Sequence, residues 1–134
     1  MNFKLTYATM FNPPAEMHTR FDAALSELNR SLGATYPLYI NGEDRVAASH
    51  DTRRSPIDQR RILGHFPLAS ADDANDAMAA AQAAFPSWRA TPMEERARLL
   101  KGVAELIEER VYDIAAAMSL EVGKNRMEGL GEVQ

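Results

Sequence analysis

A candidate phosphate loop is the first chemistry to test, because residues 121–134 read EVGKNRMEGLGEVQ and contain a Gly-Lys pair. A phosphate loop needs a glycine five positions before such a pair and a serine or threonine after the lysine. Met118 stands at the first position, and Asn125 follows Lys124. The sequence therefore excludes a phosphate loop at this point.

Gly129 and Gly131 raise a second nucleotide hypothesis, since a Gly-x-Gly can open the fingerprint of a dinucleotide-binding fold. That fingerprint continues to a third glycine or alanine, but Gln134 occupies the position. It also follows a β-strand, whereas helical spacing precedes these glycines. We therefore do not expect this glycine pair to hold a pyrophosphate.

Two consecutive helices explain the same stretch better. Gly123 is of the residue type that ends a helix, and Asn125 is favoured at a helix start. Apolar residues then recur every three positions and mark the buried side of the second helix: Met127, Leu130 and Val133. We expect the chain to stop inside this helix, and we assign no cofactor-binding residue to it.

Nucleophiles and metal ligands are sparse. The chain has no cysteine, which excludes a cysteine nucleophile, a thiolate metal site and a disulfide within these residues. No Gly-x-Ser-x-Gly elbow surrounds a serine. The histidines lack the helical pair spacing of a metal site, and we expect all three at the surface: His18, His50 and His65.

Glu105 and Glu109 are the remaining pair with a spacing that could do chemistry, since they lie four positions apart on one helix face. The neighbouring Lys101 and Arg110 indicate a solvated, charged face instead. We therefore assign no catalytic and no metal-binding residue to the chain.

An extended arm followed by a helix is predicted for residues 1–35. Pro13 and Pro14 keep the arm extended, and Gly33 is the expected stop of the helix. Between them, apolar residues recur at steps of three or four: Met17, Phe21, Leu25, Leu28 and Leu32.

The next stretch changes to an extended period. YPLYINGEDRVA contains Asn41-Gly42, a pair that suits the left-handed angles of a tight hairpin turn. In RRSPIDQRRILGHFPLA, a turn at residues 55–58 precedes an extended run through Ile62, Leu63 and Phe66. We predict two short hairpins that together form one small antiparallel sheet.

A helix is predicted from Ser70, which can form a capping box with Asp73. Its stripe of mostly small residues should pack closely against a sheet or another helix, and it contains Ala74, Ala77, Met78, Ala81, Ala84 and Phe85. Trp88 is expected to anchor the turn that follows.

The strongest helical period follows Thr91, the predicted cap, with Pro92 in the first turn and Glu94 completing a second capping box. The apolar positions alternate in steps of four and three: Met93, Ala97, Leu100, Ala104, Ile107, Val111, Ile114 and Met118. One long helix or two helices with a break between Arg110 and Asp113 would satisfy the pattern. A coiled coil is less favoured, because alanine is frequent on the seam and the run is short.

The composition bounds the function. The chain of 134 residues is 46% hydrophobic and 25% charged, which is typical of a globular domain, and its net charge is -4. Without a basic stripe we expect no nucleic acid partner. No apolar run approaches the roughly 20 residues of a membrane helix, and the acidic residues near the start do not fit a signal or transit peptide. We expect a cytoplasmic protein without membrane contact.

A family resemblance follows from several stretches taken together: LYINGE, the Ser-Pro turn, ADDANDAMAAAQAAFPSW, ERARLLKGVAELIEER and LEVGKNRMEGLGEV. This succession resembles the amino-terminal segment of the aldehyde dehydrogenase superfamily over residues 36–134. Three features are similar to the 1-pyrroline-5-carboxylate dehydrogenase (L-glutamate γ-semialdehyde dehydrogenase) branch of this superfamily: the sequence YPLYINGE, the helix that precedes it and the EVGKN stretch. Where many members have an Asn-Pro-Ala-Thr-Gly turn, this chain has SPIDQ at residues 55–59.

The resemblance implies an α/β fold with a Rossmann-like cofactor domain, of which this piece supplies helices and two short hairpins. Such enzymes use a cysteine thiolate, a glutamate that activates water, and NAD or NADP to oxidise an aldehyde, and they form homo-oligomers when complete. The family's cysteine, glutamate and main cofactor residues belong to later parts of its chains. We therefore expect residues 36–134 to be an incomplete domain of a longer oxidoreductase of proline catabolism, inactive and without cofactor by itself.

Two alternatives stay open. A helical interaction or oligomerisation module could function at this length without catalysis. An aldehyde dehydrogenase of another substrate branch would share most of the same stretches.

Overall fold

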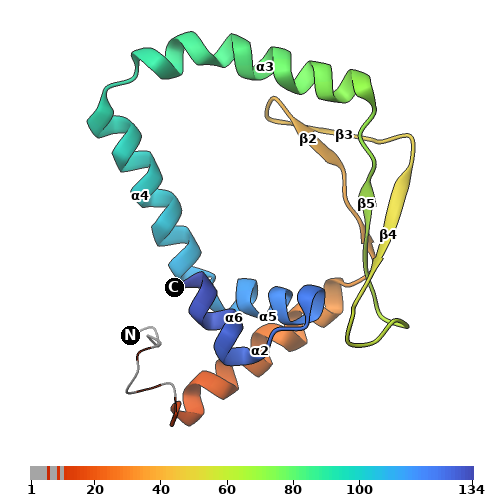
Figure 1. Cartoon of the computed structure of the whole chain (residues 1–134), viewed down its shortest axis with the longest axis vertical. Coiled ribbons are helices and arrows are strands. Elements are labelled where there is room, and N and C mark those ends of the chain that lie inside the picture. Colours follow the sequence, from red (N-terminus) through yellow and green to blue (C-terminus); the bar gives the residue numbers. More distant parts are fainter. Residues whose placement is uncertain (1–5, 7–8, 10) are drawn as a thin grey trace.

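The computed structural model describes residues 6, 9 and 11–134 (Figure 1). The helices of this part are α2 (Ala15–Ser31), α3 (Ala71–Ala90), α4 (Met93–Glu109), α5 (Val111–Val122) and α6 (Arg126–Val133). Its strands are β1 (Ala34–Thr35), β2 (Leu38–Ile40), β3 (Glu43–Arg45), β4 (His50–Arg54) and β5 (Ile62–Pro67). No described helix is both long and apolar enough to cross a membrane.

The core lies where α2 crosses α5 and α6 (Figure 1). Its buried members come from all three helices: Met17, Phe21, Ala24, Val111, Tyr112, Ala115, Ala116 and Leu130. An ion pair of 2.6 Å between Arg126 and Asp22 joins α6 to α2, and the Arg126 guanidinium lies 5.0 Å from the centroid of the Phe21 ring. Burial of these apolar side chains is therefore the main force that holds the three helices together.

The predicted first helix is confirmed as α2, with its apolar stripe on the core and Gly33 at a φ of 82° beyond its end. Leu32 is the exception, because it lies after the helix as its C-cap. Ala24, which was not part of the predicted stripe, is buried in the core instead. The predicted N-terminal arm lies largely outside the described residues, and the division at residue 35 stays a prediction.

Close approach of α5 and α6 depends on a glycine. A Cβ added at Gly129 would lie 3.1 Å from the carbonyl oxygen of Ala115 and 3.4 Å from its Cβ. Contacts this tight leave little room for any side chain. Gly129 is therefore explained by helix packing, and the predicted helix with Leu130 on its buried side is confirmed.

The strands form two hairpins, as predicted. β2 and β3 pair antiparallel around Asn41 and Gly42, whose φ values of 56° and 83° are those of a type I′ turn. β4 and β5 form the second antiparallel pair. The prediction of a single sheet is wrong, because β2 and β3 stand apart from a three-stranded sheet in the order β1, β5, β4.

The unpredicted strand β1 pairs parallel to β5, with Ala34 opposite Gly64. Gly64 leaves room for the ring of Tyr36, since a Cβ there would lie 2.8 Å from that ring. Tyr36 also stacks on Phe66, with 5.0 Å between the ring centroids. Two residues of extended chain have no period that a sequence pattern could detect.

Ser55 joins the turn between β4 and β5 to the end of α5. Its side chain is buried, and its Oγ donates a hydrogen bond of 2.6 Å to the carbonyl oxygen of Leu120. The same Oγ accepts from the backbone N–H of Ile57 at 3.3 Å. This hydroxyl therefore satisfies a buried helix-end carbonyl that would otherwise lack a partner.

We expect Ser55→Ala to reduce the free energy of unfolding by about 1–3 kcal/mol, because the Leu120 carbonyl would stay buried without its donor. Hydrogen exchange of the α5 amides measures the change. Ser87→Ala is the matched control, since the Ser87 hydroxyl donates to a carbonyl at an exposed position. Equal effects of the two variants would contradict the role of Ser55.

α3 begins as predicted, with a capping box. The Ser70 hydroxyl and backbone N–H donate to the Asp73 carboxylate at 2.7 and 2.8 Å, and these bonds lower the pKa of Asp73. The expectation that the alanine stripe packs closely is not met within the described chain, because α3 has no buried residue. An ion pair of 2.6 Å between Arg45 and Asp76 joins α3 to β3.

The junction after α3 differs from the prediction. Thr91 caps the end of α3, with its hydroxyl donating to the Ser87 carbonyl at 3.0 Å, and makes no side-chain cap for α4. Trp88 lies in the last turn of α3 and is 44% exposed, so it does not anchor a buried turn. Of the two alternatives left open, the structure has two helices, since Arg110 separates α4 from α5. The predicted stop at Gly123 is confirmed, because Gly123 ends α5 in the left-handed conformation.

Candidate functional site

The glycine-containing stretch after α5 forms a helix cap. The Asn125 side chain accepts from the backbone N–H groups of Met127 and Glu128, both at 3.0 Å, and Glu128 accepts from the Asn125 N–H. The first N–H groups of α6 are thus partly satisfied by a side chain of the chain itself. Gly129 and Gly131 lie within α6 and not in a turn after a strand.

The histidines are not brought together, and Glu105 and Glu109 both lie on α4 as exposed residues. His18 is exposed on α2, while His50 lies on β4 and His65 on β5. His65 shares a hydrogen bond of 2.9 Å with the Thr52 hydroxyl. Within residues 6, 9 and 11–134, no three His, Cys, Asp or Glu side chains are grouped to hold a metal ion.

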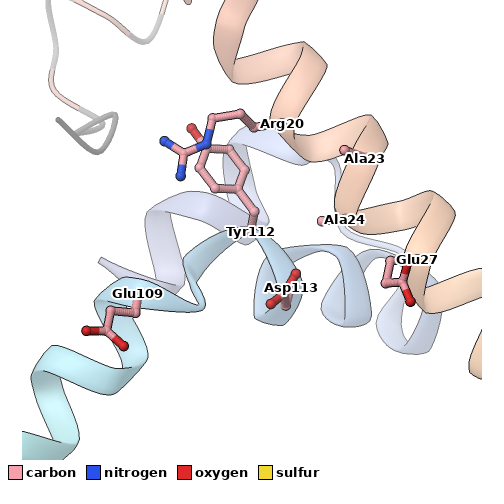
Figure 2. A pocket seen from close by; sticks show the side chains of 7 residues that line it. All are labelled: Arg20, Ala23, Ala24, Glu27, Glu109, Tyr112 and Asp113. Atoms are coloured by element: carbon pink, nitrogen blue, oxygen red, sulfur yellow. The ribbon is translucent and has the colours of Figure 1, made fainter.

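A shallow hollow of about 350 Å³ lies between α2, the end of α4 and the start of α5 (Figure 2). The residues that line it combine one cation, three carboxylates, two alanines and a phenol: Arg20, Glu27, Glu109, Asp113, Ala23, Ala24 and Tyr112. Of these, the sequence reasoning had singled out only Glu109. This hollow is a candidate site because it gathers charged side chains around a buried phenol.

Arg20 and Tyr112 dominate the hollow. The Arg20 guanidinium lies over the Tyr112 ring, 4.5 Å from its centroid, so a cation–π contact joins α2 to α5 (Figure 2). Tyr112 is only 6% exposed, and its hydroxyl has no hydrogen-bond partner among the described residues. A buried hydroxyl without a partner opposes folding.

Burial also raises the pKa of Tyr112 above its ordinary value of 10.0, against the lowering effect of the Arg20 charge. The raised pKa keeps the folded phenol neutral when the unfolded one ionises. Stability from this group is therefore fully present below pH 10 and is lost as the pH rises above it. The phenol is not prepared to act as a base near neutral pH.

The carboxylates around the hollow do not form a catalytic pair. Figure 2 shows Glu109 at the end of α4 pointing away from Asp113, while Glu27 projects from α2 on the other side. All three side chains belong to exposed residues. The hollow is therefore a helix junction stabilised by Arg20 and Tyr112, and its geometry supports no reaction.

Tyr112→Phe tests this conclusion. Removing a hydroxyl that has no partner should leave the free energy of unfolding unchanged or raise it by up to about 1 kcal/mol. Hydrogen exchange of the α2 and α5 amides measures the change, with the exposed Tyr39→Phe as the matched control. A loss of stability in Tyr112→Phe alone would reveal a partner for the hydroxyl and overturn the conclusion.

Sequence reasoning missed Arg20 and Tyr112 because neither lies on an apolar stripe. Tyr112 directly follows Val111, the position at which the four-and-three spacing continues into α5. The available signal was the possible break near Arg110, one of the two alternatives that the pattern allowed, since a new helix start can turn a residue from the exposed side toward the core.

Comparisons with known proteins bear on what the chain is. The model of the aldehyde dehydrogenase family matches residues 46–134. 1-Pyrroline-5-carboxylate dehydrogenase 2 of Bacillus subtilis is 36% identical over 104 residues, which are 78% of this chain and 20% of that protein. The resemblance found in the sequence is therefore confirmed.

Solved structures agree on the fold. A 1-pyrroline-5-carboxylate dehydrogenase from Thermus with bound NAD superposes with a TM-score of 0.89 and 29% identity, over 99% of this chain and 25% of that one. An NAD-dependent aldehyde dehydrogenase from Sinorhizobium meliloti gives 0.72 and 37% identity, over 79% of this chain and 22% of that one. The predicted fold class is confirmed, and the chain spans about a fifth to a quarter of the length of these relatives.

Proposed function

The chain belongs to the aldehyde dehydrogenase family, and from this membership we propose that it is the N-terminal part of an enzyme that oxidises L-glutamate γ-semialdehyde to L-glutamate. The observation that carries the proposal is the likeness to the Thermus 1-pyrroline-5-carboxylate dehydrogenase over nearly the whole described chain. The structure of that relative has bound NAD, which supports NAD as the cofactor of the whole protein. A cytoplasmic location and a homo-oligomeric enzyme stay predictions.

The described residues would contribute structure and not chemistry. When bound, a nicotinamide cofactor supplies the acceptor for the hydride that leaves the substrate. Gly129, the first glycine of the Gly-x-Gly, is packed against Ala115, and we assign no residue of the chain to the cofactor. The chain has no cysteine to attack an aldehyde. We propose that residues 1–134 are inactive alone and that they form the N-terminal helices of the enzyme.

The test is an assay of NADH formation with the protein expressed from the whole reading frame that contains these residues. We expect turnover with 1-pyrroline-5-carboxylate, which is in equilibrium with the semialdehyde, and weaker turnover with simple aliphatic aldehydes. A preference for another aldehyde would assign the protein to another branch. No turnover with any aldehyde would overturn the enzyme proposal.

Residues 1–134 purified alone are the matched sample, and a mock purification sets the background. We expect no aldehyde-dependent reduction of NAD or NADP, because the thiolate nucleophile is absent from these residues. Turnover above the background would overturn the proposed inactivity.

The second candidate function, a non-catalytic helical interaction module, is favoured by one observation. α3 and α4 expose several large apolar side chains, among them Phe85, Leu100 and Ile107. Such a surface is typical of a helix that contacts a partner. The folding behaviour of the isolated chain distinguishes this function from an incomplete enzyme domain.

A further inference from the structure

We draw no further inference here: the strongest candidate, the apolar surface that α3 and α4 leave exposed around Phe85, Leu100 and Ile107, has no partner among the described residues, and nothing in the structure shows what covers it.

Discussion

Phe21→Ala is expected to reduce the free energy of unfolding of the core formed by α2, α5 and α6 by about 3–5 kcal/mol. Phe21 is 2% exposed and is among the largest fully buried side chains of the described residues. Its loss would leave a cavity between the three helices and remove the ring that lies under Arg126. Because Phe21 is the largest fully buried side chain that α2 contributes, we expect this helix to open more readily.

Hydrogen exchange of the α2 and α5 amides measures the effect of Phe21→Ala directly. Phe11→Ala is the matched control, because Phe11 is 86% exposed and a surface substitution changes stability by about 0.5 kcal/mol or less. If both variants exchange like the parent chain, α2 is not held by the apolar core. In that case polar contacts would have to hold it, among them the Arg126–Asp22 ion pair and the contact of Arg20 with the Tyr112 ring. Replacing both Arg126 and Arg20 by Met would then release α2.

Local signals predicted most elements. The capping box of Ser70 and Asp73, the Asn41-Gly42 turn and the stop at Gly123 depend on neighbours in sequence, and each was confirmed. These features work through side-chain caps and positive φ values, which a residue type largely fixes by itself. A sequence can therefore state where such elements begin and end.

Long-range pairing was not predictable in the same way. β1 joins β5 because Gly64 makes space for the Tyr36 ring, a contact between residues far apart in the chain. The prediction of a single sheet was wrong for the same reason. A hairpin pattern determines how its own two strands pair, but not which other strands lie beside them. The family resemblance carried the fold class, which composition and period alone did not reach.

The candidate site was the least predictable part. Arg20 and Tyr112 meet because α2 crosses the start of α5, and that crossing depends on packing in the core. Thr91 shows a different kind of error. Its residue type suits the start of α4, but its side chain caps the end of α3. A residue type that favours a cap does not say which of two adjacent helices it will serve.

Leu100→Ala separates an incomplete enzyme domain from a self-sufficient module. Leu100 is 66% exposed on α4, so the substitution should change the stability of isolated residues 1–134 by only about 0.5 kcal/mol. In the whole enzyme we expect a loss of about 2–5 kcal/mol, because a Leu that is buried there would leave a cavity. Leu130→Ala is the matched control, since Leu130 is 0% exposed and should destabilise both proteins.

The apolar positions of the period that runs through α4 and α5 differ in burial, because Val111 is buried in the core of this chain while Leu100 and Ile107 are exposed. Burial of Leu100 and of Ile107 would each add about 1.5–3 kcal/mol to the free energy of unfolding. Together they would supply a large share of the roughly 5–15 kcal/mol by which a typical domain is stable. Without that burial, we expect isolated residues 1–134 to keep helical circular dichroism, bind a hydrophobic dye and unfold without a sharp transition. A sharp cooperative melt without dye binding, together with a large loss of stability in Leu100→Ala, would mean that the chain buries α4 by itself. The non-catalytic module would then be the better description.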